Sequence, residues 1–166
     1  MPRTTLQHLI AHNYPALAQG LLGPLLDLLS VTREACGGDI DKFLIMLVVA
    51  IRTTAHKDFA TFTAEQLASG EVAVFPSLGI NIQSIADSIG APKETVRRKV
   101  GELVDTGWIA RQGNELYLTG RAVADLAPAR AQIEQMALRY HEIVEALAER
   151  AEPPAEPPRA DAGPCV

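Results

Sequence analysis

Apolar residues between positions 80 and 119 change from a helical to a strand spacing along the chain. The first set recurs every three or four residues and predicts a helix that begins near Asn81: Ile82, Ile85, Ala86 and Ile89. Gly90 is suited to the left-handed conformation that ends a helix, and Pro92 has its φ preset for the first position of the next one. That second helix is predicted over residues 92–106, with this inward stripe: Val96, Val100, Leu103 and Val104.

A hairpin is predicted directly after this helix pair. Gly107 ends the second helix, residues 108–111 form a strand, 112–114 a turn, and 115–119 a return strand in which apolar and polar positions alternate. Residues 75–79 are expected to add a short first strand to the same sheet. Two helices across a tight turn, followed by a short hairpin, predict a winged helix-turn-helix, which places its second helix in the DNA major groove.

Basic side chains gather on the second helix and at the hairpin tip. Arg98 lies almost opposite the buried stripe and can donate two hydrogen bonds to guanine, while Glu94 beside it can accept one from cytosine N4. Phosphate contacts are expected from the remaining cations: Lys93, Arg97, Lys99 and Arg111. The candidate DNA-binding residues are Lys93, Glu94, Thr95, Arg97, Arg98, Lys99, Arg111, Gln112 and Asn114.

The segment Lys93-Glu94-Thr95-Val96-Arg97-Arg98 resembles the recognition helix of the cyclic-AMP receptor/FNR class of bacterial regulators. This resemblance implies that the base-reading positions of that class fall on Lys93, Glu94 and Arg98. The order of elements, with helices before and after a central winged helix, is more similar to the MarR class. Both resemblances imply a winged-helix transcription regulator that binds double-stranded DNA.

The N-terminal third is predicted to be helical and rich in leucine. Apolar residues mark a first helix over 6–10 and a second over 17–29, and glycines and Pro24 predict that the second is kinked or split. A third helix over about 39–54 is apolar nearly all round and is expected in a core or an interface. Thr63 is expected to cap a further short helix, with a glutamine at the capping-box position.

A C-terminal helix is predicted from about Gly120, with an interruption at Pro128. Its apolar stripe recurs at three and four residues: Ile133, Met136, Ala137, Tyr140, Ile143, Val144 and Leu147. The stripe favours packing against a second protomer, and packing against the N-terminal region of its own chain is the alternative. The tail 151–166, rich in Pro, Ala and Glu, is expected to be disordered.

Together these elements predict a mainly α fold with a small β-hairpin wing, a winged helix-turn-helix flanked by N- and C-terminal helices. Four regions are expected. Residues 1–62 form an N-terminal helical region for core packing, dimerisation or sensing, and 63–121 form the DNA-binding domain. Residues 122–150 form a C-terminal helix for packing or dimerisation, and 151–166 form the tail.

Composition narrows the classes of function. The 166 residues carry a net charge of −5, so DNA binding would have to come from a local positive patch. Between residues 91 and 111 five basic residues stand against three acidic ones, a modest excess. No signal-peptide pattern is recognisable, and the apolar run 43–51 is too short to span a bilayer. A cytoplasmic protein without a membrane partner is expected.

No catalytic or metal-binding constellation is recognisable in the sequence. Cys36 and Cys165 form neither a disulfide framework nor a zinc module. His8 and His12 are four residues apart but lack a third ligand. We therefore expect no enzyme activity, no cofactor and no metal.

The expected function is sequence-specific DNA binding by a homodimeric transcription regulator. One alternative is that the winged helix serves as a protein–protein adaptor or co-regulator, which the acidic net charge favours. Another is a one-component sensor, in which kinked N-terminal helices form a pocket for a small-molecule effector.

Overall fold

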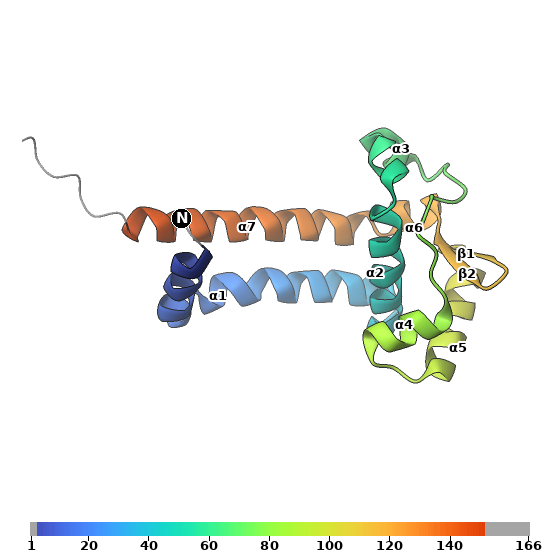
Figure 1. The fold of residues 1–166 in the computed structure, drawn as a ribbon, viewed down its shortest axis with the longest axis horizontal. Coiled ribbons are helices and arrows are strands. Elements are labelled where there is room, and N and C mark those ends of the chain that lie inside the picture. Colours follow the sequence, from blue (N-terminus) through green and yellow to red (C-terminus); the bar gives the residue numbers. More distant parts are fainter. Residues whose placement is uncertain (1–2, 152–166) are drawn as a thin grey trace, which may run out of the picture.

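The computed structural model describes residues 3–151, a mainly helical chain with a small two-stranded antiparallel sheet (Figure 1). The disorder expected of the tail, and Cys165 within it, lie outside the described residues. In chain order the elements are α1 (Arg3–Ala35), α2 (Ile40–Thr54), the short 3-10 helix η1 (Lys57–Thr61), α3 (Ala64–Ser69), α4 (Ile82–Ile89), α5 (Lys93–Asp105), β1 (Ile109–Gln112), β2 (Glu115–Leu118), α6 (Gly120–Asp125) and α7 (Ala127–Ala151).

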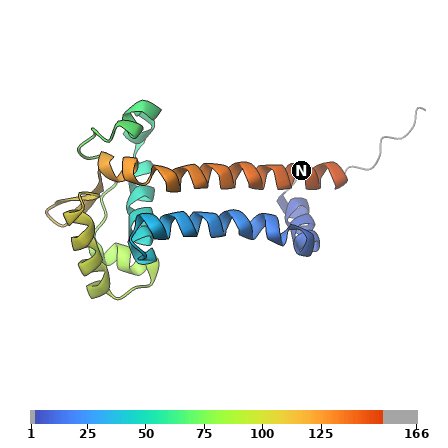
Figure 2. The ribbon, with the colours of Figure 1, turned by 180° about the vertical axis from the view of Figure 1, so that it is seen from behind.

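α1 and α7 lie side by side and antiparallel, and they project from the other elements as an arm (Figures 1 and 2). We call this helix pair the arm and the remaining elements the body. The Tyr140 hydroxyl donates to the Leu21 carbonyl at 2.9 Å. A Cβ added at Gly20 would lie 2.9 Å from Cδ1 of Ile143, so the glycine permits this close approach. α7 therefore packs on the N-terminal helix of its own chain, which was the alternative left open by the sequence.

α1 is a single helix where the sequence predicted two. Pro15 and Pro24 lie inside it, and each removes one backbone hydrogen bond from the preceding turn. Figure 1 shows the first turns, in dark blue, set at an angle to the rest of the helix. The bend therefore lies between the two predicted helices, and the kink expected at Gly20, Gly23 and Pro24 does not interrupt the helix.

α1 is also apolar along much of its length. Among the described helices, Leu6–Ala35 is the stretch long and apolar enough to cross a membrane, with a mean hydropathy of 1.2. Core helices of soluble proteins and N-terminal signal sequences have the same property. Only 11% of this apolar window is buried in the single chain, so most of its residues keep some contact with solvent.

α2 is the central helix of the body, as its apolar character predicted. Ile45 and Val49 are fully buried, and Met46 is nearly so. The helix packs against α4, α5 and β2 in one hydrophobic core. The expected boundary at residue 62 therefore does not separate two packing units, because α2 belongs to the same core as the elements of 63–121.

The hairpin forms where it was predicted, but its turn is only Gly113-Asn114, because Gln112 belongs to β1. The expected third strand is missing. β1 and β2 pair antiparallel from Ile109↔Leu118 to Gln112↔Glu115. Residues 75–80 run beside β2 and bond to it only at their two ends, where the Phe75 N–H donates to Leu118 and the Leu116 N–H donates to the Ile80 carbonyl, each at 2.9 Å. A proline without an N–H at 76 and a left-handed glycine at 79 (φ 69°) prevent a regular ladder between those ends.

Gly120 joins the hairpin to α6 at a close backbone approach. Its N–H donates to the Val72 carbonyl at 2.7 Å. A Cβ at this position would lie 2.5 Å from the Val72 oxygen and 2.9 Å from the Gly70 oxygen. The preceding Thr119 caps α6 and donates its hydroxyl to the Gly107 carbonyl at 2.7 Å. These contacts fix the end of the hairpin against the body.

Candidate functional site

The connection between α4 and α5 is short because a glycine ends one helix and a proline precedes the next. Asn81 caps α4 by accepting from the Ser84 N–H at 3.0 Å, and Gly90 ends the helix at φ 66°, both as predicted. Pro92, with φ −58° and ψ 133°, is the N-cap of α5 and not its first residue. Its extended ψ keeps it outside the helix, while its carbonyl accepts from the Val96 N–H at 3.1 Å. The second helix is therefore 93–105, shorter at both ends than predicted.

One side of α5 is fixed in the core. Val96, Val100 and Leu103 are at most 1% exposed, which confirms these positions of the predicted inward stripe, while Val104 is half-buried. Ala86 of α4 is also buried, and its small side chain lets the two helices pack closely. The opposite side of α5 is left open to solvent.

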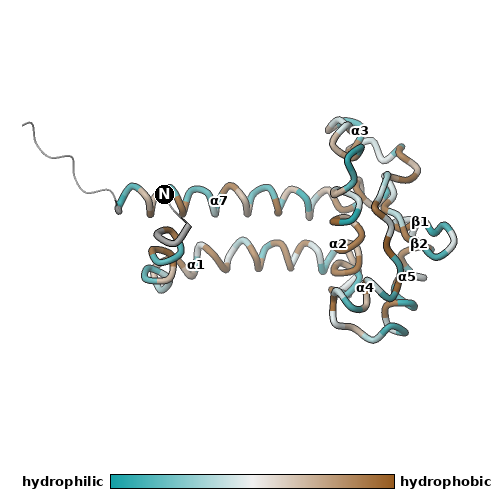
Figure 3. Tube along the Cα trace, in the orientation of Figure 1, coloured by the Kyte–Doolittle hydropathy of each residue, from teal (hydrophilic) through white to brown (hydrophobic). Residues whose placement is uncertain are grey.

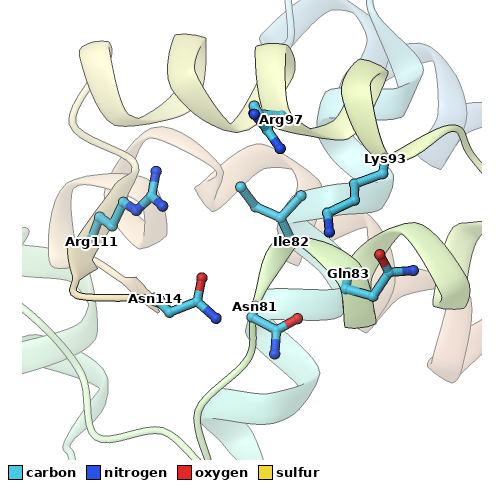
Figure 4. A pocket seen from close by; sticks show the side chains of 7 residues that line it. All are labelled: Asn81, Ile82, Gln83, Lys93, Arg97, Arg111 and Asn114. Carbon is cyan, nitrogen blue, oxygen red and sulfur yellow. The ribbon is translucent and has the colours of Figure 1, made fainter.

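A hollow of about 410 Å³ lies between the start of α4, the start of α5 and the hairpin (Figure 4). Three cationic side chains reach it from two elements: Lys93 and Arg97 from α5, and Arg111 from β1. Polar side chains and one apolar residue complete the lining: Asn81, Ile82, Gln83 and Asn114.

The hollow is suited to an anion. None of the described residues that line it carries a carboxylate. The Glu94 carboxylate lies 3.5 Å from Nε of Arg97, but it is 81% exposed and outside the lining. Guanidinium and ammonium groups together with amide side chains are the donors that bind phosphate oxygens. Four of the predicted site residues, namely Lys93, Arg97, Arg111 and Asn114, are brought together here.

Arg98 does not line the hollow. Its side chain is 63% exposed and pairs with the Glu102 carboxylate at 2.6 Å, one turn further along α5. Glu102 is also held by Lys42 of α2 at 2.7 Å. The hydrogen bond from Lys42 and the charge of Arg98 hold the pKa of Glu102 below its ordinary value. Arg98 is thus on the outer face of α5, as expected, but it is already engaged by a carboxylate.

Lys99 was expected to contact phosphate, and the structure contradicts this. Its side chain is only 9% exposed, and its ammonium contacts Asp39 at 2.5 Å and Asp41 at 3.0 Å. Burial by itself would lower the pKa of Lys99, but the hydrogen bonds to the two aspartates outweigh it and raise that pKa above its ordinary value. Lys99 therefore joins α5 to the start of α2 and is not available to a ligand.

The other predicted residues lie around the hollow without lining it. Thr95 is half-buried on α5, and Gln112 is exposed at the end of β1. The sequence reasoning missed Gln83, and it treated Asn81 only as a helix cap. The tight α4–α5 turn was the available signal, because it sets the two helices at an angle with side chains of both reaching the same space.

A comparison of this chain with protein-family models, with curated proteins and with solved structures found no match.

Proposed function

We propose that this protein is a sequence-specific DNA-binding transcription regulator with a winged helix-turn-helix. In this proposal α4 and α5 are the helix pair, α5 enters the major groove, and the β1–β2 hairpin is the wing that contacts the backbone. The protein acts in the cytoplasm as a homodimer. The observation that carries the proposal is the hollow in which Lys93, Arg97 and Arg111 face one space without a carboxylate in its lining.

The geometry of the hollow fits a phosphate of the DNA backbone. The start of α4 contributes to its lining, and the positive end of a helix dipole favours negative charge there. A phosphate placed there would set the outer face of α5 against the base edges. Arg98 and Glu94 are exposed on that face and are the proposed base-reading residues.

The test is binding to fragmented genomic DNA by fluorescence anisotropy at two salt concentrations, followed by selection and sequencing of the bound fraction. Arg97→Ala should weaken binding to all sequences alike and reduce the salt slope by about 1, since one phosphate contact is lost. Arg98→Ala should cost about 1–3 kcal/mol at the selected site and relax its specificity. Arg139→Ala removes an exposed cation of the arm and is the control, because Arg139 lies outside the hollow.

A pseudo-palindromic selected sequence, lost in Arg98→Ala, would support a dimer that reads paired half-sites. If Arg97→Ala and Arg139→Ala change DNA affinity and the salt slope equally, the hollow does not contact DNA. Failure to bind any fragment at low salt would favour the adaptor or co-regulator alternative. A pull-down with and without nuclease then separates protein partners from partners held through DNA.

A second hollow, which is apolar, favours the ligand-responsive alternative. It measures about 290 Å³ and lies between α2 and η1 of the N-terminal region and α6 and the start of α7. The bent helix α1 does not line it. Its lining is almost entirely apolar, including Phe43, Met46 and Leu118. In this second candidate function an apolar effector enters there and alters DNA binding. A rise in thermal stability with such a compound, lost on Leu47→Glu, is the expected result, because Leu47 lines the hollow but is 36% exposed and outside the core.

A further inference from the structure

The arm has two unlike sides. One side holds an open hollow of about 650 Å³ whose mixed lining comes from both helices and has these polar members: Gln19 and Asp27 of α1, and Gln132, Gln135 and Arg139 of α7. The other side of α1 carries leucines that are 40–64% exposed: Leu22, Leu25, Leu26 and Leu29. Figure 3 shows hydrophobic positions recurring along both helices of the arm.

The spacing of these leucines defines a second packing face on α1. The first face, which includes Leu21 and Leu28, packs on α7. At about 100° per residue, the exposed leucines are centred about 100° around the helix from that first face. In a four-helix bundle each helix has two neighbours and therefore needs two apolar faces about a right angle apart. α1 has both faces, and one of them has no partner within the described chain.

α7 continues the apolar side of the arm. Ile133 is 39% exposed, Ala137 is exposed and Val144 is half-buried, and all three lie on the flank of α7 opposite Gln135 and Arg139. Since those two polar residues share a hollow with the polar flank of α1, the apolar flanks of the two helices face the same way. The exposed leucines are thus part of a face built by both helices.

We infer that a second copy of this chain covers the apolar side of the arm, so that two arms form a four-helix bundle about a two-fold axis. A two-fold interface brings the same patch together from both copies and so requires a patch that is complementary to itself. Between Leu22 and Leu29 the only charged residue is Asp27, and it lines the polar hollow on the other side. An uncharged leucine patch meets this requirement.

The size of the face also fits a second copy. A helical segment of about 20 residues is about 30 Å long and about 10 Å wide, so two of them present about 600 Å² in projection. This is comparable to the roughly 800 Å² per partner that stable complexes bury. The functional role of this dimer rests on the proposed function, since two joined copies would read paired DNA half-sites.

The test is sedimentation equilibrium of the full chain from about 1 to 100 μM, a range in which a micromolar dissociation constant is measurable. Leu22→Glu is the test variant and Leu138→Glu its matched control, because the two leucines are 53% and 57% exposed on the same arm. Leu138 lies on the outer flank of α7, away from the proposed interface. Circular dichroism and thermal unfolding of both variants establish that the helices are retained.

The expected result is a dimeric parent, a dissociation constant raised at least about 100-fold by Leu22→Glu, and no such change with Leu138→Glu. A monomeric parent over this range would overturn the inference, as would an equal response of the two variants. Capture of a monomeric parent by anionic lipid vesicles would assign the face to a membrane instead. If the parent is a dimer but does not bind DNA, this inference is supported and only the proposed function is refuted.

Discussion

Replacing Lys99 with Met separates the structural role of this residue from the DNA-contacting role that its charge first indicated. The ammonium bridges two carboxylates at the start of α2, those of Asp39 at the N-cap and Asp41 in the first turn. Methionine keeps most of the length and apolar stem of lysine but leaves two carboxylates near each other without the cation. The fold should be weakened, while the hollow formed by Lys93, Arg97 and Arg111 is untouched.

The magnitude follows from how much water reaches the three groups. Removing one partner of a fully buried ion pair costs about 3–5 kcal/mol. Here Lys99 is 9% exposed, but the side chains of Asp39 and Asp41 are 27% and 43% exposed and recover part of their hydration. We therefore expect a loss of about 1–3 kcal/mol in the free energy of unfolding. At about 2–4 °C per kcal/mol this corresponds to a fall of roughly 2–12 °C in the unfolding midpoint.

Urea unfolding followed by circular dichroism measures this loss, with parent and variant at one protein concentration because dimerisation would add to apparent stability. Lys42→Met is the control, since its partner Glu102 is 37% exposed and the loss should be below about 1 kcal/mol. The salt slope of DNA binding by folded Lys99→Met should equal that of the parent. If Lys99→Met is as stable as the parent and its salt slope of DNA binding is lower by about 1, Lys99 contacts phosphate and the structural role is refuted.

Three further outcomes are expected. Gly120→Ala should lower the free energy of unfolding by about 1–3 kcal/mol, because its Cβ would lie 2.5 Å from the Val72 oxygen; urea unfolding measures this, and an unchanged midpoint would refute it. Gly101→Ala meets no atom within 4 Å and should raise stability by up to about 1 kcal/mol in the same assay. Burial opposes ionisation of Asp39, yet its hydrogen bond from Lys99 holds the pKa below its ordinary value. The stability that this aspartate contributes is therefore present above about pH 4 and lost as pH falls through the lowered pKa. The raised pKa of Lys99 means that the stability contributed by this lysine is lost as the pH rises above about 10. The free energy of unfolding, measured against pH, should therefore fall less in Lys99→Met than in the parent at both the acidic and the alkaline end.

Local patterns predicted the helix pair and the hairpin well, since each depends on residues close in sequence. Asn81 and Gly90 define α4 through a cap and a left-handed end, and the spacing of Val96 and Val100 identifies the buried side of α5. The error at Pro92 was one position, because a preset φ suits both the N-cap and the first helical residue, and only ψ distinguishes them.

Features that depend on distant residues were not predictable in the same way. The helical wheel puts Lys99 at the edge of the buried stripe, and its partner Asp39 is 60 positions earlier in the chain. Likewise, the sequence showed apolar stripes on α1 and α7 but not that they would meet within one chain. The expected third strand failed for a local reason, since Pro76 cannot donate to β2.

The Lys42–Glu102–Arg98 cluster bears on how the proposed interface would discriminate among sequences. In the absence of DNA, Arg98 pairs with the Glu102 carboxylate, so in the proposed complex a base edge would compete with Glu102 for the guanidinium. A guanine offers two acceptors to the guanidinium and therefore compensates for the lost ion pair better than a base that offers fewer. Lys42 keeps Glu102 paired after Arg98 departs, so the release leaves no carboxylate without a cation. The cluster would thus act as a threshold that penalises wrong sites more than the right one.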